Sequence, residues 1–123
     1  MVSADEVERH RSAYADAAAA NGRWIDSGAS PENANREFDR IIAAYLALSD
    51  TEEGRAALAQ LASHDDEWIA CWAASHCLWF EIDLARARLT ELANAASSPF
   101  VRIGARWTLK EFDEGNLRDP RVW

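Results

Sequence analysis

The stretch "DDEWIACWAASHCLWFEID", residues 65–83, decides how the rest of the chain must fold. From Trp68 to Phe80 it contains no Asp, Glu, Lys or Arg, so a helix formed here is apolar on every side. A helix without a polar face is typical of a segment buried between neighbouring helices. We therefore expect a central core helix, with Trp68, Trp72 and Trp79 on one stripe that is mostly covered.

The composition indicates a single helical domain, residues 1–123, with 49% hydrophobic residues and a formal net charge of -8. Such a charge repels phosphate groups, so nucleic acid and anionic membranes are poor partners and a basic protein is a favourable one. No apolar run approaches the roughly 20 residues that a membrane helix needs. The charge is also compatible with a role in solubility alone.

The first residues, "MVSADEVERH", contain no apolar segment of the kind found in signal peptides, so we expect a cytoplasmic protein. Cysteine usage agrees, because Cys71 and Cys77 are the two cysteines of the chain. On one helix their side chains would point about 120° apart and could not form a disulfide.

Helix signals occur along the whole chain, and no segment shows the alternation that is typical of a strand. We predict an all-α fold of about six helices joined by short connections. Gly22 and Gly115 follow helical patterns as stop signals, and the segment 22–30 between the first two helices is predicted to be a loop. The predicted helix starts are at Ser3, Ser30, the run Ser49-Asp50-Thr51, Asp65, Asp83 and Ser98.

The second half of the chain contains an internal repeat, with units at about residues 51–80 and 83–114. The sequence "LAQLASHDDEWIACWAASHCL" aligns with "LTELANAASSPFVRIGARWTL", and each unit reads as helix, tight loop, helix. Such units bury their apolar faces by stacking on one another, so the repeat predicts a short solenoid. The second unit contains Val-Arg-x-x-Ala-x-x-x-Leu at residues 101–109, a pattern that is similar to the inner helix of a HEAT repeat.

On these motifs the chain resembles a family of short, uncharacterised bacterial HEAT-like helical proteins, which are immunity-protein-like. The upstream "NANREFDRIIAAYLAL" is similar to that family's second helix. The resemblance implies a short HEAT-like α-solenoid of antiparallel helix pairs, and members of such families are thought of as immunity proteins that neutralise secreted toxins by binding them. The residues at the family's central positions are Leu58, Leu61, His64, Asp66, Ile69, Trp72, Ala73, Ala74, His76 and Leu78.

We expect no catalytic residues, metal site or cofactor. His76 and Cys77 are adjacent on a helix, which points them about 100° apart and separates a thiol from its base. His64, Asp65 and the acids after it include metal-ligand types, but not in the spacing of a known metal site. Phosphate-binding and nucleophile-elbow motifs are absent from the sequence.

The preferred hypothesis is a non-enzymatic protein-binding module, plausible as a bacterial immunity protein whose partner is a basic toxin. Two alternatives stay open: a scaffold or self-associating helical-repeat module, and a HEAT-like nucleic-acid enzyme, which the negative charge disfavours. The oligomeric state is not determined by the sequence. The predicted partner-binding residues are Asp65, Asp66, Glu67, Trp68 and Trp72.

Overall fold

The computed structural model describes residues 3–28 and 31–123, and within these ranges it contains six α-helices and no strand. The prediction of an all-α fold with about six helices is therefore confirmed. A short 3-10 turn, Pro120–Val122, follows the last helix. The helices are α1 (Ala4–Asp26), α2 (Pro31–Ser49), α3 (Glu52–Leu61), α4 (Glu67–Cys77), α5 (Ile82–Ala95) and α6 (Pro99–Asp113).

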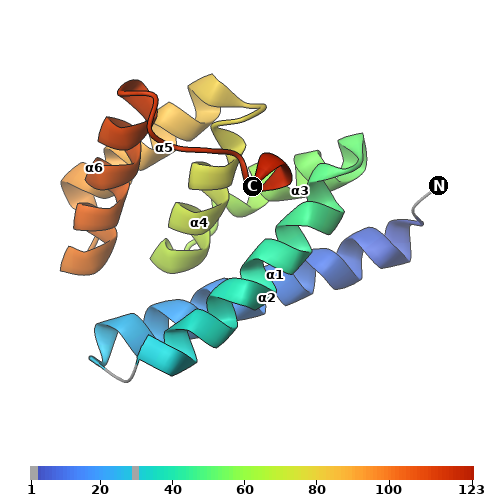
Figure 1. The fold of residues 1–123 in the computed structure, drawn as a ribbon, viewed down its shortest axis with the longest axis horizontal. Helices are drawn as coiled ribbons and strands as arrows, with labels where there is room; N and C mark the ends of the chain where they lie inside the picture. Colours follow the sequence, from blue (N-terminus) through green and yellow to red (C-terminus); the bar gives the residue numbers. More distant parts are fainter. Residues whose placement is uncertain (1–2, 29–30) are drawn as a thin grey trace.

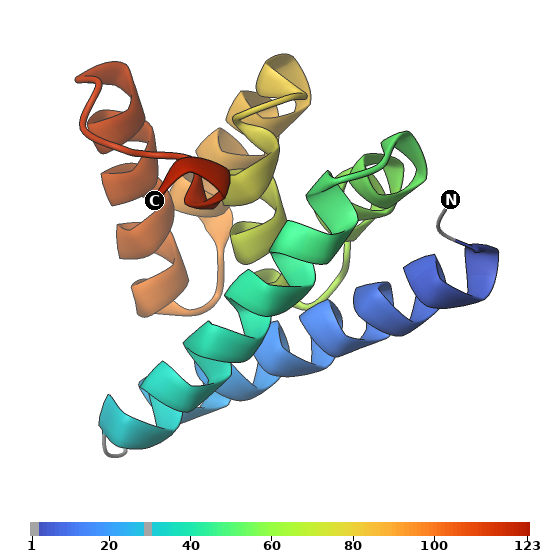
Figure 2. The same cartoon turned by 45° about the vertical axis from the view of Figure 1, so that its right-hand side comes forward.

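Two long helices and four shorter ones make up the molecule. Figure 1 shows α1 and α2 packed side by side as an antiparallel pair, with α3 to α6 stacked across one side of that pair. The residues after α6 turn back over α4 and end close to α2, as both ribbon views show (Figures 1 and 2). The C-terminal segment thus connects the last helix to the second.

Short-range capping explains most helix ends. The side-chain oxygens of Ser3, Thr51 and Ser98 each accept a hydrogen bond from the backbone N–H three residues further on, which confirms these three predicted starts. Gly115 has a φ of 77° just after α6, as expected for a glycine that ends a helix. The predicted cap at Ser30 lies outside the described residues.

Two other predicted starts are wrong by one or two positions. The side chain of Asp66, not that of Asp65, accepts hydrogen bonds from the first backbone N–H groups of α4. Helix α5 begins at Ile82 after Glu81, which forms no side-chain cap. Asp83 lies inside the first turn of α5, where the helix dipole favours a negative charge without a capping bond.

The predicted stop at Gly22 is also wrong, because α1 continues through it to Asp26. A Cβ atom at position 22 would lie 2.1 Å from Cγ of Trp68 on α4. Glycine therefore allows the indole to pack directly on the α1 backbone. Its helix-propensity cost of roughly 1 kcal/mol is compatible with a helix held by tertiary packing.

Helix α4 lies at the centre of the core and packs against α1, α3, α5 and α6. Its small side chains Ala70, Ala73 and Ala74 are fully buried, which permits close approach of the neighbouring helices. The prediction of a buried central helix in this stretch is supported. The larger core side chains around it are Tyr14, Ile41, Tyr45, Leu48, Leu58, Leu61, Leu89 and Val101.

Candidate binding groove

The tryptophan stripe of α4 is anchored on one side by α1. The indole N–H of Trp68 donates to Oδ2 of Asp26 at 2.7 Å, and that of Trp72 donates to Oδ1 of Asn21 at 3.2 Å. Both rings, like that of Trp79, are half-buried. Because the N–H groups are satisfied toward α1, the remaining ring surface is available on the other side.

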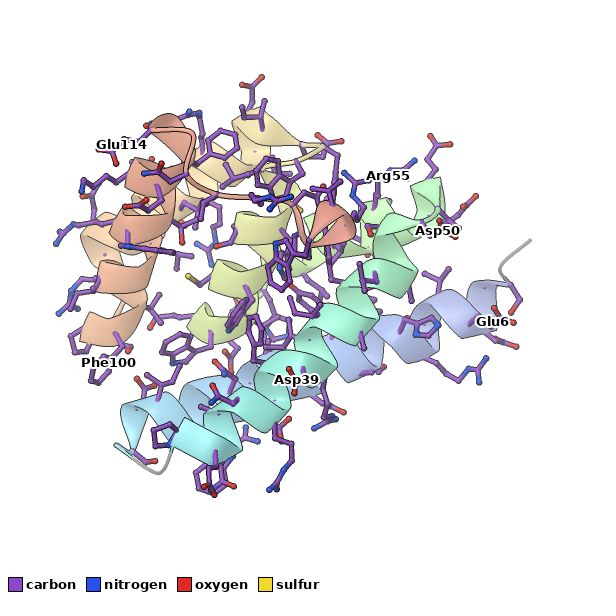
Figure 3. All side chains as sticks on the ribbon, viewed as in Figure 1. Glu6, Asp39, Asp50, Arg55, Phe100 and Glu114 are labelled. Atoms are coloured by element: carbon purple, nitrogen blue, oxygen red, sulfur yellow. The ribbon has the colours of Figure 1, made fainter. Side chains whose placement is uncertain are left out.

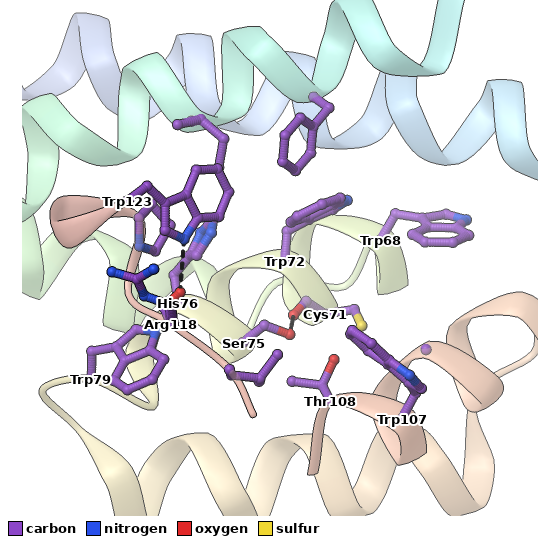
Figure 4. Close-up of a pocket in the computed structure, with 15 residues that line it drawn as sticks. Trp68, Cys71, Trp72, Ser75, His76, Trp79, Trp107, Thr108, Arg118 and Trp123 are labelled. Atoms are coloured by element: carbon purple, nitrogen blue, oxygen red, sulfur yellow. Dashed lines mark hydrogen bonds between the residues drawn. The ribbon is translucent and has the colours of Figure 1, made fainter. Parts of the chain in front are cut away.

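That other side is the wall of a pocket of about 380 Å³, which is within the usual range of ligand sites. The pocket lies between α2, α4, α6 and the C-terminal segment (Figure 4). Five of the six tryptophans of the chain line it. The lining residues are Phe38, Ile42, Trp68, Cys71, Trp72, Ser75, His76, Trp79, Gly104, Trp107, Thr108, Leu117, Arg118, Pro120 and Trp123.

The C-terminal segment is held in place by a buried carboxylate. The hydroxyl of Tyr45 on α2 donates to Oδ1 of Asp119 at 2.9 Å, and Arg121 Nε donates to Oδ2 of the same residue at 2.7 Å. Burial acts to raise the pKa of Asp119, but the hydrogen bonds from Arg121 and Tyr45 outweigh it and lower the pKa below its usual value. Trp123 then stacks on Phe38, with ring centroids 6.1 Å apart.

His76 is a buried polar residue in the lining of the pocket. Its Nδ1 lies 2.6 Å from the hydroxyl of Tyr14, and its ring stacks on Tyr45 at a centroid distance of 4.2 Å. Burial lowers the pKa of His76 to about 3, only partly offset by the negative charge of Asp119, so the ring is neutral at pH 7. The prediction of a hydrogen-bonded core histidine is confirmed.

The two cysteines are buried and do not form a disulfide. Burial raises the pKa of Cys71 and of Cys77 to about 12 in each case, so both remain protonated thiols at neutral pH. A protonated thiol is a poor nucleophile and a poor metal ligand. In the parts of the chain that the structure describes, no cluster of three His, Cys, Asp or Glu side chains could hold a metal ion.

The predicted partner-binding residues divide into two groups. Trp68 and Trp72 line the pocket, whereas Asp65, Asp66 and Glu67 lie outside it at the start of α4. The Glu67 carboxylate accepts hydrogen bonds from the backbone N–H groups of residues 97 and 98, at 2.7 and 3.2 Å. Two of the three acids thus have structural roles, in capping α4 and in holding the α5–α6 connection, while Asp65 is exposed.

Sequence reasoning missed the part of the pocket that α2, α6 and the C-terminal segment contribute. The helical spacing of Gly104, Trp107 and Thr108 could have placed Trp107 on one face of α6. The contribution of Phe38 and Trp123 has no local signal, because it depends on a contact between residues far apart in the chain.

Comparisons with known proteins do not identify a relative. No protein-family model, curated protein or solved structure matches the chain. In the described residues no helix is long and apolar enough to cross a membrane.

Proposed function

We propose that this chain is a non-enzymatic protein-binding module, and that its partner places apolar side chains in the tryptophan-lined groove. The observation that carries the proposal is the exposure of Trp107 and Trp123 at the edge of the groove, 56% and 62% respectively. Exposing two indoles beside a preformed apolar pocket is costly for a protein that acts alone. Tryptophan is also strongly enriched among the residues that dominate binding energy in protein interfaces.

The charge of the chain supports a basic partner, and the class of protein that we propose is an immunity protein that binds a basic toxin. The net charge of -8 favours encounter with a positively charged surface. Asp65, which is exposed close to Trp68 in the sequence, is a candidate for the edge of this contact. The carboxylates of Asp66 and Glu67 add to the local negative potential although they bond to the chain's own backbone.

We also propose that α3 to α6 form a short HEAT-like stack. Residues at equivalent places in the two sequence units are buried alike: Ile69 with Val101, and Ala73 with Ala105. Successive helices α3, α4, α5 and α6 pack on one another in chain order. This arrangement supports a solenoid in which the inner helices present one side to the groove.

The proposal can be tested on the purified chain with the product of a neighbouring gene as the candidate partner. We expect a stable complex by calorimetry, which Trp107→Ala and Trp123→Ala each weaken by roughly tenfold or more. Trp24→Ala is the matched control, since Trp24 is an exposed tryptophan on α1 that does not line the pocket. Failure of any such complex to form, or an equal loss with the Trp24 variant, would contradict the proposal.

The contribution of charge needs a separate measurement. We expect Asp65→Asn to slow association with a basic partner and added salt to reduce the difference between variant and wild type. Surface plasmon resonance at two salt concentrations would show this effect in the association rate. An unchanged rate would exclude Asp65 from the contact.

A second candidate function, self-association, is favoured by one further observation. Phe100, Ile103 and Trp107 form an exposed apolar stripe along α6, and Figure 3 shows Phe100 at the outer end of that helix. A second copy could cover such a stripe in a symmetric dimer. Light scattering with size-exclusion chromatography at several concentrations would detect it, and Ile103→Glu should return the protein to a monomer without altering a pocket residue.

A further inference from the structure

The interior of the pocket differs in charge from the molecule as a whole. Although the chain has a net charge of -8, the 15 lining residues include no Asp, Glu or Lys. Arg118 is their single permanently charged member. The lining is thus mostly apolar and aromatic, with the hydroxyls of Ser75 and Thr108 and one cation, in an acidic protein.

His76 supplies a second polar group to this space. It is 6% exposed and lines the pocket, and its Nδ1 is occupied by Tyr14. Within the described part of the chain, no hydrogen bond reaches its Nε2. A fully buried nitrogen without a hydrogen bond would be an unsatisfied polar atom, and Nε2 is not one. The small exposed part of this ring therefore includes Nε2, and the surface it faces is the pocket.

The tautomer of His76 follows from the burial of Tyr14. Tyr14 is 0% exposed, and the bond to His76 is the one hydrogen bond of its hydroxyl among the described residues. If Nδ1 carried the proton, the hydroxyl hydrogen of Tyr14 would be buried without an acceptor, which is unfavourable. The hydroxyl therefore donates to Nδ1, and the proton of the neutral ring is on Nε2.

Arg118 and His76 belong to the same end of the pocket. The C-terminal segment places Arg118 there, where the indole N–H of Trp123 donates to the Arg118 carbonyl at 3.0 Å. Figure 4 draws Arg118, His76, Trp79 and Trp123 at this end, and Trp107 toward the other. One end thus offers an N–H donor and a guanidinium, one of whose N–H groups donates to the Val122 carbonyl at 3.0 Å. The rest of the lining is mostly aromatic.

We propose that the pocket binds a small planar apolar molecule that carries a carboxylate. The apolar body lies against the indoles of Trp72, Trp79 and Trp107, and the carboxylate accepts hydrogen bonds from Nε2–H of His76 and from Arg118. This inference goes beyond the proposed function, because it concerns the interior of the groove and a small ligand instead of a protein partner.

The same observations argue against a cationic ligand. Aromatic pockets bind quaternary ammonium groups through the faces of their rings. Here the single formal charge of the lining is positive, and the ring nitrogen of His76 that faces the space is a donor. A cation would be repelled by Arg118 and would leave the Nε2–H group without an acceptor.

The test is calorimetric titration with three probes that share a naphthalene ring: 1-naphthoate, the isosteric 1-naphthamide, and 1-naphthylmethylammonium. We expect saturable binding of the carboxylate, about tenfold tighter than the amide and tighter still than the ammonium. Arg118→Gln should remove most of that preference, while Arg106→Gln should not, since Arg106 is an exposed arginine on α6 that does not line the pocket. Equal affinities, tighter binding of the ammonium, or no saturable binding would overturn the proposal.

Substitution of His76 also leaves the buried Tyr14 hydroxyl without its acceptor, so the role of His76 in ligand binding is tested in the unsubstituted protein. Long-range proton–nitrogen correlation spectra report which ring nitrogen carries the proton, and we expect Nε2–H in the free protein and a shift of its signal on adding 1-naphthoate. A proton on Nδ1, or binding of the carboxylate without a change at Nε2, would overturn the assignment. These outcomes do not depend on whether a protein partner is found.

Discussion

Helices α4 and α6 carry similar patterns, yet only α4 is enclosed. Ile69 and Ala73 on α4 correspond to Val101 and Ala105 on α6, and all four are buried. Beyond these shared positions the two helices differ: α4 also buries a histidine and two cysteines, whereas α6 exposes a stripe that includes Trp107. The difference is one of neighbours, because α4 packs against α1, α3, α5 and α6, and α6 lies at the end of the stack (Figure 2).

The comparison shows that a repeated pattern determines which face of a helix is apolar but not whether that face is covered. The groove forms where the two helices meet α2 and the C-terminal segment, so an enclosed wall faces a partly open one. The side of the groove on α4 is therefore largely covered, whereas the side on α6 includes the exposed Trp107.

The largest expected difference between the two walls concerns one tryptophan on each. Trp72→Ala should lower the free energy of unfolding by about 3 kcal/mol, since the indole bonds to Asn21 and packs against Phe38 and His76. Trp107→Ala should lower it by less than about 1 kcal/mol, because that side chain is mostly exposed. Urea denaturation of both variants measures the contrast, and similar losses would show that α6 is as enclosed as α4.

A second contrast concerns pH and His76. Its pKa is about 3 in the folded protein against the ordinary value of 6.5, so the unfolded chain binds a proton that the folded one does not between these values. The neutral, buried ring makes its full contribution to the free energy of unfolding above about pH 6.5. As the pH falls from there toward 3, that free energy decreases by roughly 1.4 kcal/mol per pH unit. Urea unfolding at pH 7 and pH 5 should therefore differ by about 2 kcal/mol from this group alone.

The control for this prediction uses the equivalent position on α6. Residue 108 aligns with residue 76, and Thr108 is half-buried. We expect Thr108→His to add little pH dependence and His76→Phe to reduce the existing one. If the free energy of unfolding changed equally with pH in His76→Phe and wild type, the assignment of the pH dependence to this residue would be contradicted.

The smallest expected effect distinguishes two glycines. Gly22→Ala should lower the free energy of unfolding by about 1–2 kcal/mol, because the new methyl group would collide with the indole of Trp68. Gly104→Ala on α6 should raise it by roughly 0.5–1 kcal/mol, since nothing lies within 4 Å of the added atom and alanine favours a helix. A lower melting temperature for Gly22→Ala and a higher one for Gly104→Ala would support the comparison. A higher melting temperature for both variants would refute the close α1–α4 contact.

Part of this structure could be predicted from local sequence alone. The charge-free run after Trp68, the caps at Ser3, Thr51 and Ser98, and the glycine after α6 determined an all-helical chain with a buried central helix. These features depend on periodicity and on hydrogen bonds between residues a few positions apart, so they can be recognised without knowledge of the fold. Net charge is likewise a property of composition.

Only the tertiary structure decided where the groove lies and what faces it. The extension of α1 through Gly22 depends on an indole from α4, and the role of Glu67 depends on backbone N–H groups of the α5–α6 connection, about 30 positions away. The pocket requires Phe38 and Trp123, which are 85 positions apart in the chain, to stack on each other. Such contacts arise from the packing of whole helices, and no local pattern encodes which distant side chains will meet.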